Sequence, residues 1–490
     1  MPNDREAFRL NLEYYRKAAK CLLKAAQSGD AAALERMAHH SSKPEPPALH
    51  HAQLTIAREL GFASWPRFRA FLAESALDFQ GLAAKFIDAA TEDLRRAAEM
   101  LARYPAIAGA GFYVALVLGD VARVERALGE SPGIATAKGG PNNVPPLVYA
   151  CFSRFASAHS DRAGDLAATV GLLLAHGADP DTSYMSPNWP DNPLSVLYAA
   201  SGLNNNVDMT RLLLDAGARI DDGESLYHST EHADLACFRL LLERGAKTNG
   251  SNALNHMLDR DEPEGLRLLL AAGTDPNILN YRGETSLHWA VWRGRSTAAV
   301  GALLDAGVAI DAKRPDGRTA YAMAVQSGQT ATANLLAARG ANPEISPLDR
   351  YVGDCAVADE AQLQRLMAAP PAGKPPDEFA RLLPDLASSH STSAVRGLLA
   401  AGVDVNTRGE HGGTALHWAC WKGYPDIVKL LLEHGASLTV EDNSFHAPPA
   451  GWLHHGHENC GEGDYVQVAR LLLAAGATIE ESALRDLGVA

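Results

Sequence analysis

Residues 283–311 read GETSLHWAVWRGRSTAAVGALLDAGVAID, and residues 412–436 read GGTALHWACWKGYPDIVKLLLEHGA. The two stretches share the order T-x-L-H-W-A, a glycine turn, a second apolar run and a closing glycine. Each apolar run has helical periodicity, and the closing glycine suits the left-handed residue at which many helices end. We therefore expect each stretch to form two helices joined by a tight turn.

The closing phrase L-L-L-x-x-G-A recurs along the chain, at successive separations of 40, 28, 28, 34, 33, 62, 33 and 41 residues. Most separations lie near 33, and the separation of 62 fits two periods in which one unit lacks its glycine. A fixed period of about 20–50 residues is typical of a repeat protein. The glycines that mark the repeat are Gly177, Gly217, Gly245, Gly273, Gly307, Gly340, Gly402, Gly435 and Gly476.

Both quoted stretches resemble the ankyrin repeat, whose signature is T-P-L-H-x-A, a glycine turn and a second helix ending in L-L-L-x-x-G-A. Ser286 and Ala415 stand where that signature has proline. The resemblance covers roughly residues 108–480 and implies an all-α solenoid of helix-turn-helix units with short finger loops. It also implies that His288 and His417, at the signature histidine, bridge backbone groups of adjacent repeats.

The domain organisation that follows has a small helical cap, a long array and a second helical cap. We expect about eleven or twelve repeat units in the array, degenerate in one part and interrupted by two insertions. The expected ranges are 1–80 for the N-terminal cap, 81–480 for the array, 481–490 for the C-terminal cap, 347–406 for the degenerate part, and 153–165 and 443–464 for the insertions.

The N-terminal cap contains the phrase AQLTIARELGFASWPRFRAF, residues 52–71. This phrase resembles a segment found ahead of ankyrin arrays in many bacterial proteins, and no activity is attached to that segment. Its two helical stretches flank Gly61, which suits a helix end, and Pro66 suits a first helical turn. We expect the cap to shield the apolar face of the first repeat.

Composition excludes several classes of function. Lys plus Arg number 44 against 58 for Asp plus Glu, giving a net charge of −14 at pH 7, and an acidic chain repels nucleic-acid phosphates. No apolar run reaches the roughly 18 residues of a membrane span. Six cysteines without a C-x-x-C pair indicate a reducing, cytoplasmic location. Phosphate loops, nucleophile elbows and dinucleotide fingerprints are missing, so we expect no cofactor and favour a non-enzymatic role.

The first helix of each unit supplies the candidate partner contacts. Positions two and five after the signature leucine share one helical face, which lines the concave surface in stacks of this kind. Five of the seven tryptophans fall there, and tryptophan is a common interface anchor. Alternatively, the rings fold over the seam between repeats, where each N–H finds a carbonyl. We expect a protein or peptide in the concave groove, contacted by Tyr149, Phe152, His228, Glu231, His256, Asp259, Trp289, Trp292, Arg293, Trp418, Trp421, Trp452 and His455.

A polar set within that face supports a second hypothesis. His228 and Glu231 occupy positions equivalent to those of His256 and Asp259 in the next unit. Two imidazoles and two carboxylates could hold a divalent metal, with His228 and His256 as ligands, or divide general acid and base roles. The alternative function is therefore an enzyme, or a binder of a small ligand or metal; an ordinary polar face also fits. His228 through His232 further matches H-x-x-E-H, a zinc-peptidase pattern.

A second stretch rich in metal-binding residue types lies in the last insertion. His454, His457 and Cys460 fall within a few residues of one another, and imidazole and thiolate both suit transition metals. A loop that rims the groove is the alternative for this stretch.

Overall fold

The computed structural model describes residues 11–40, 46–75, 77–157, 159–185, 192–280, 282–372, 381–460 and 463–489. The chain forms two compact units, Met1–Asp222 and Gly223–Ala490. Of the predicted domains, the following lie outside the described residues: 1–10, 41–45 and 76 of the N-terminal cap, 158, 186–191, 281, 373–380 and 461–462 of the array, and 490 of the C-terminal cap.

The described part of the first unit is helical apart from one short antiparallel hairpin of β1 (Ser183–Tyr184) and β2 (Leu194–Ser195). Its helices are α1 (Leu12–Gln27), α2 (Ala31–His40), α3 (Leu49–Glu59), α4 (Trp65–Ser75), α5 (Phe79–Glu92), α6 (Leu94–Arg103), η1 (Pro105–Gly109), α7 (Phe112–Leu118), α8 (Val121–Glu130), η2 (Pro132–Ala135), α9 (Pro146–Phe152), η3 (Arg154–Ala156), α10 (Ala163–Ala175), α11 (Val196–Tyr198), η4 (Ala199–Leu203) and α12 (Val207–Asp215).

Helices α1 to α4 have a hydrophobic core of their own. Phe68 is fully buried at its centre, and the ring of Tyr15 meets it edge-on with 4.9 Å between centroids. Trp65, the first residue of α4, also packs on Phe68, with 5.5 Å between ring centroids. Trp65 and Phe68, the aromatic residues of the 52–71 stretch that are buried here, therefore pack in this core.

In the second unit, the described residues form helices and the loops that join them, with no strand. The helices are α13 (Ser225–Ser229), α14 (Ala236–Glu243), α15 (Ala253–Asp259), α16 (Pro263–Ala271), α17 (Ser286–Trp292), α18 (Thr297–Asp305), α19 (Ala320–Gln326), α20 (Thr330–Ala338), α21 (Pro347–Val357), α22 (Glu360–Met367), α23 (Leu382–Ser388), α24 (Thr392–Ala400), η6 (Glu410–Gly412), α25 (Ala415–Lys422), α26 (Pro425–Glu433), α27 (Pro449–Asn459), α28 (Tyr465–Ala474) and α29 (Glu481–Asp486).

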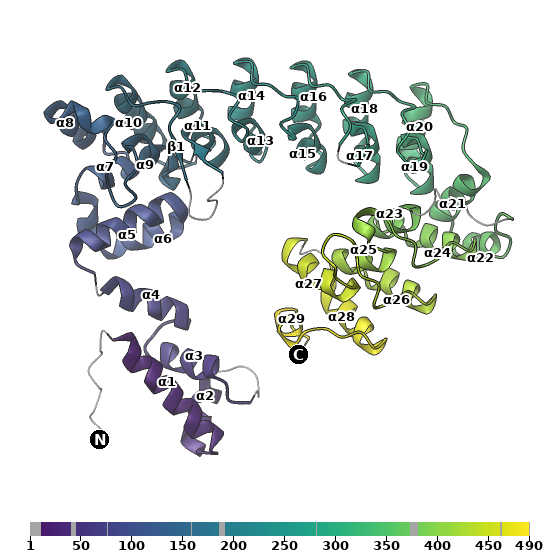
Figure 1. The fold of residues 1–490 in the computed structure, drawn as a ribbon, viewed down its shortest axis with the longest axis horizontal. Coiled ribbons are helices and arrows are strands. Elements are labelled where there is room, and N and C mark those ends of the chain that lie inside the picture. The colour runs from purple at the N-terminus through teal and green to yellow at the C-terminus, as the bar shows by residue number, and fades with distance from the viewer. Residues whose placement is uncertain are drawn as a thin grey trace. The chain divides into compact units, whose positions relative to one another are not determined.

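Stacked helix pairs build this unit, as Figure 1 shows for α13 to α20. From α13 to α20, and again from α23 to α28, the first helix of each pair packs on the first helix of the next pair, and the second helix on the next second helix; between these two runs, α21 packs on α24. The predicted all-α fold is confirmed. No helix among the described residues is both long and apolar enough to cross a bilayer.

The local sequence explains each pair. Thr285 caps α17 in a capping box with His288, and Thr414 forms the same box with His417 at α25. The Nε2 atom of His417 also lies 3.2 Å from the carbonyl oxygen of Ala447, in the following repeat. Burial lowers the pKa of His417 and holds that of His288 at about 4, so both rings are neutral at pH 7.

The degenerate part still folds as helices, α21 to α24. Helix α23 packs on α25, and α25 packs closely on α27. At the second contact Gly456 lies so near α25 that an added Cβ would stand 2.8 Å from the Cα atom of Trp421. Glycine at this position therefore permits the approach of two helix backbones.

Candidate functional site

Two of the predicted tryptophan anchors are buried. Trp289 and Trp452 are 7% and 4% exposed. The indole N–H of Trp289 donates to Asp259 at 2.8 Å, and that of Trp452 donates to Asp442 at 3.0 Å. Their predicted exposure is wrong because the rings fold into the seam between repeats, where a carboxylate satisfies each N–H.

The C-terminal tryptophans form one cluster around Trp452. The rings of Trp418 and Trp421 meet it edge-on, with centroid separations of 5.2 and 5.9 Å. Both of these rings are half-buried, and Phe445, at 6.1 Å from Trp452, is 67% exposed. His455 is exposed on α27. The part of this cluster that a partner could reach is therefore its rim.

In the first unit, the predicted contacts Tyr149 and Phe152 are 1% and 5% exposed. The Tyr149 hydroxyl donates to the Gly139 carbonyl at 2.9 Å, and burial raises its pKa. Phe152 packs edge-on against Tyr184 at 5.4 Å. Their predicted exposure is also wrong, because every residue of α9 is buried.

The side chains of His228, Glu231, His256 and Asp259 do not converge, because they contact different neighbours. His228 lies 3.0 Å from Glu231 and 3.2 Å from Glu224. The His256 ring instead meets the Thr230 hydroxyl, and burial lowers its pKa. Asp259 accepts from Trp289, and its Oδ1 lies 3.0 Å from the Nε atom of Arg293.

This arrangement argues against the metal and acid–base hypothesis. In the described part of the chain, no group of three or more His, Cys, Asp or Glu side chains is placed to hold a metal ion. Helix α13 ends at Ser229, so Glu231 and His232 of the H-x-x-E-H string lie beyond it and the string has no common helical face. The four side chains instead present a polar, partly exposed surface.

Two residues of the second metal candidate, His454 and His457, lie in α27, and Cys460 follows its last residue. His454 faces Asp486 at 3.4 Å, whereas the His457 ring packs on Tyr465 at 5.3 Å. The Cys460 sulfur lies 4.0 Å from the Nζ atom of Lys422. The three predicted ligands thus have three separate neighbours, and the structure does not bring them together.

A buried ion cluster lies in the same unit, and sequence reasoning missed it. The Arg314 guanidinium is fully buried, 3.1 Å from Glu284, 3.4 Å from Asp316 and 3.1 Å from Asp385. Arg318 contacts Asp316 at 2.7 Å and Asp385 at 2.9 Å. Burial opposes ionisation of Asp385, but the surrounding arginines hold its pKa below the usual range.

A third arginine joins this cluster to the tryptophans. Arg282 lies 3.3 Å from Glu284 and 3.5 Å from Asp385. Its guanidinium also stacks over Trp292 at 4.3 Å from the ring centroid. Asp385 belongs to α23, whereas the three arginines belong to the finger loops that precede α17 and α19. The ion cluster therefore links α23 to these two loops.

Apolar side chains of α23 also face residues of α17 and α19. Leu382 and Leu386 of α23 share a small space of about 20 Å³ with Val291, Trp292 and Met323. Figure 1 shows α23 beside α19. Helix α23 therefore covers part of the surface of α17 and α19.

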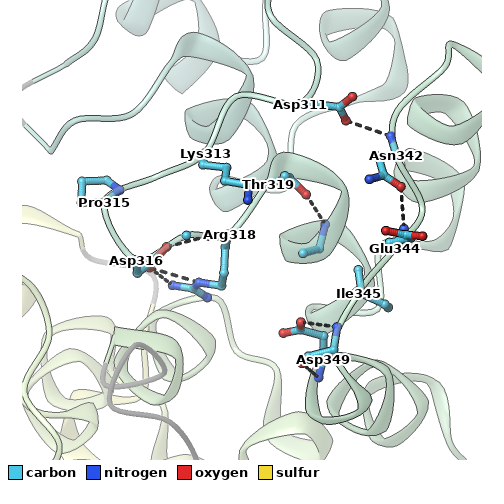
Figure 2. A pocket seen from close by; sticks show the side chains of 13 residues that line it. Asp311, Lys313, Pro315, Asp316, Arg318, Thr319, Asn342, Glu344, Ile345 and Asp349 are labelled. Carbon is cyan, nitrogen blue, oxygen red and sulfur yellow. Dashed lines mark hydrogen bonds and ion pairs between the residues drawn. The ribbon is translucent and has the colours of Figure 1, made fainter.

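An open groove lies between two successive finger loops, residues 311–319 and 342–349 (Figure 2). Its volume is about 700 Å³. Asp311 accepts from the backbone N–H of Asn342 at 2.8 Å, and Asn342 accepts from that of Glu344 at 3.0 Å. These bonds fix the backbone of the second loop. We call this site the finger groove.

Negative charge predominates in the finger groove. The side chains of Asp311, Asp316, Glu344 and Asp349 line it, against two cationic ones, Lys313 and Arg318. Asp349 accepts from the backbone N–H of Ser346 at 3.0 Å, and Asp316 is paired with Arg318. Glu344 is exposed, and no ion pair involves it among the described residues. Its carboxylate is therefore available at the rim.

Comparisons with known proteins agree with the repeat. Residues 254–346 and 383–442 match the family of ankyrin repeats. The chain is 32% identical over 143 residues to a putative ankyrin repeat-containing protein of Treponema pallidum (strain Nichols), covering 29% of this chain and 39% of that protein. It is 30% identical over 159 residues to a transient receptor potential cation channel subfamily A member 1 homolog of Caenorhabditis elegans, covering 32% and 13%.

Among solved structures, the chain is similar to the human ASB11 ankyrin repeat domain, at 23% identity and a TM-score of 0.23, covering 46% of this chain and 85% of that one. The chain spans about two fifths of the Treponema protein and about an eighth of the worm protein. The family match confirms ankyrin repeats in the second unit.

Proposed function

Because the chain contains ankyrin repeats, which generally mediate protein–protein interactions, we propose that it is a non-enzymatic scaffold that binds an extended segment of a protein partner. The finger groove of the Gly223–Ala490 unit is the principal contact. The partner segment carries Lys or Arg side chains that complement the charge of the groove.

The shape and charge of the finger groove carry this proposal. A volume of about 700 Å³ lies within the roughly 300–1,000 Å³ typical of binding pockets. The hydrogen bonds from Asp311 and Asn342 hold the loop backbone in place before binding, which lowers the ordering cost that binding must offset. Four carboxylates against two cations favour a basic ligand.

The polar inner face of α13 and α15 extends this surface in the proposal. Glu231 and Asp259 are exposed, and His228 and His256 are half-buried. The ring of Tyr227 contacts the rings of both histidines. Burial raises the pKa of Tyr227, and the nearby carboxylates raise it further. We keep these residues as contacts, together with the exposed rim of the tryptophan cluster at Trp418, Trp421 and His455.

The test of the groove is a charge reversal at Glu344. Peptides selected from a displayed library of random extended sequences should be rich in Lys and Arg. Glu344→Lys should raise their Kd about tenfold, corresponding to about 1.4 kcal/mol, because one attraction becomes a repulsion. Fluorescence anisotropy with labelled peptides measures the change.

The matched control is Glu243→Lys, since Glu243 is exposed on α14 and does not line the groove. It makes the same change in net charge and should leave the Kd within about twofold. Selection of neutral or acidic peptides, or equal losses in the two variants, would show that the groove is not the binding site.

A further inference from the structure

A second pocket in the same unit has the opposite electrostatic character. Its volume is about 330 Å³, and it lies where the turns that follow α17, α19, α23 and α25 meet. Three cationic side chains and four serines line it, and no Asp or Glu does. We call it the basic pocket; its lining comprises Trp292, Arg293, Gly294, Arg295, Ser327, Gln329, Ser388, Ser389, Ser391, Lys422 and Tyr424.

Two of the three cations have no carboxylate at ion-pair distance in the described part of the chain. The Nζ atom of Lys422 lies 4.0 Å from the Cys460 sulfur. Arg295 donates to backbone carbonyls, at 3.0 Å to Arg293 and at 3.1 Å to Asp259. Burial lowers the pKa of Arg295, and the carboxylates of Asp261 and Asp259 act against that effect without pairing with it directly.

The third cation is held in a fixed position. Arg293 pairs with Asp259 at 3.0 Å and stacks over Trp292 at 4.8 Å from the ring centroid. Arg282 stacks on the same ring at 4.3 Å. A guanidinium held in this way presents its remaining N–H groups without further ordering.

A second feature of the lining is a donor without an acceptor. The indole N–H of Trp292 is buried and has no hydrogen-bond acceptor among the described residues. A buried donor without an acceptor costs free energy, so such groups are rare in native structures. The Ser327 and Ser389 hydroxyls already donate to the carbonyls of Met323 and Leu386, at 2.7 and 3.3 Å, so the cations are the main donors that the basic pocket offers a ligand.

The acidic groups near the basic pocket have partners of their own. Asp259 is bound to Trp289 and to Arg293 of the pocket, and Asp261 accepts from the backbone N–H and the hydroxyl of Ser296. Asp426, close to Tyr424 in the chain, accepts from Thr392 at 2.7 Å and lies 2.9 Å from the His390 ring. None of these carboxylates lines the pocket.

We propose that the basic pocket binds a phosphate monoester. A phosphate presents three acceptor oxygens and close to two negative charges at pH 7, which match the three cations that line the pocket. Lys422 and Arg295 contact the phosphate oxygens. The monoester is carried either by a phosphorylated peptide or by a free small molecule. This site is separate from the finger groove and does not depend on it.

The experiment is isothermal titration of the full chain at low salt with three probes: inorganic phosphate, O-phosphoserine, and a phosphoserine peptide beside its unphosphorylated form. Binding of all phosphorylated probes with similar Kd supports a free ligand, and tighter binding of the phosphopeptide supports a peptide-borne group. No phosphate-dependent heat at about 10 mM probe, roughly ten times a Kd of 1 mM, overturns the proposal.

Two variants locate the binding. Lys422→Gln should weaken phosphate binding about tenfold or more, because it removes a charge-assisted hydrogen bond. Ser389→Glu places a carboxylate at an exposed position of the pocket and should abolish binding without disturbing the fold. Unchanged affinity in both variants would overturn the assignment to this pocket.

Two control variants separate this proposal from the others. Lys429→Gln, at an exposed cation of α26, removes the same charge outside the pocket and should leave phosphate binding unchanged. Glu344→Lys in the finger groove should also leave it unchanged, so failure of either binding site is distinguishable from failure of the other.

Discussion

Asp385→Asn is expected to lower the free energy of unfolding of the second unit by about 3–5 kcal/mol, the usual cost of removing one partner from a buried ion pair. Asp385 lies within 3.5 Å of Arg282, Arg314 and Arg318. Without its charge, these buried guanidinium groups lose a shared counter-ion, and α23 loses its polar attachment to α17 and α19. Urea unfolding followed by tryptophan fluorescence reports this unit, because five of the seven tryptophans belong to it.

The control is Asp305→Asn, which makes the same change in an exposed pair with Arg339 at 2.7 Å. Exposed pairs contribute about 0–1 kcal/mol, so a loss in Asp305→Asn as large as that in Asp385→Asn would contradict the role of the buried ion cluster.

Acid sensitivity gives a second readout of the same cluster. The pKa values of Asp385 and Asp316 lie below the usual range in the folded protein because the arginines oppose the effect of burial. Their contribution to stability is therefore complete above the unfolded pKa of about 3.9 and is lost as the pH falls through the folded values. With Asp385→Asn, the free energy of unfolding should fall less steeply as the pH decreases below about 3.9.

Trp452→Ala is expected to destabilise the C-terminal repeats by about 3–5 kcal/mol, the usual cost of deleting a buried large aromatic ring. The ring is 4% exposed and contacts both Trp418 and Trp421. Its loss also removes a donor from Asp442, whose pKa is held at about 2 by this N–H and by backbone N–H groups, against the effect of burial. Thermal unfolding measures the loss.

Two companion substitutions separate the contributions. Trp452→Phe keeps a ring but removes the hydrogen bond to Asp442, and should cost about 1–3 kcal/mol. Phe445→Ala, at a ring that is 67% exposed, should change stability by at most about 0.5–1 kcal/mol. If Trp452→Ala were as mild as Phe445→Ala, Trp452 would be a surface residue and the packing described above would be wrong.

The repeat could be predicted because its signals are local. Thr285 and His288 cap one helix within four residues, and Gly307 ends the next helix at a φ of +79°. Such contacts lie between neighbours in sequence, so the sequence pattern predicts both the helices and their ends.

The site could not be predicted in the same way, because helical periodicity identifies a face of a helix and not what covers it. Trp292 lies on the predicted face, but α23, from a degenerate unit about 90 residues later, packs against it. Charged residues are seldom fully buried, so nothing in the local sequence indicates that Arg314 and Arg318 are buried. Their counter-ion Asp385 lies 67 residues beyond Arg318 in the chain, and no local pattern indicates that pairing.

Hydrogen exchange of the protein, with and without a selected cationic peptide, tests most directly whether the finger groove binds a partner. At a free peptide concentration near the wild-type Kd, the account predicts slower exchange of backbone amides in residues 311–319 and 342–349, and much less slowing in Glu344→Lys. Protection confined to the Met1–Asp222 unit, or equal protection of these loops in Glu344→Lys at the same peptide concentration, would contradict it.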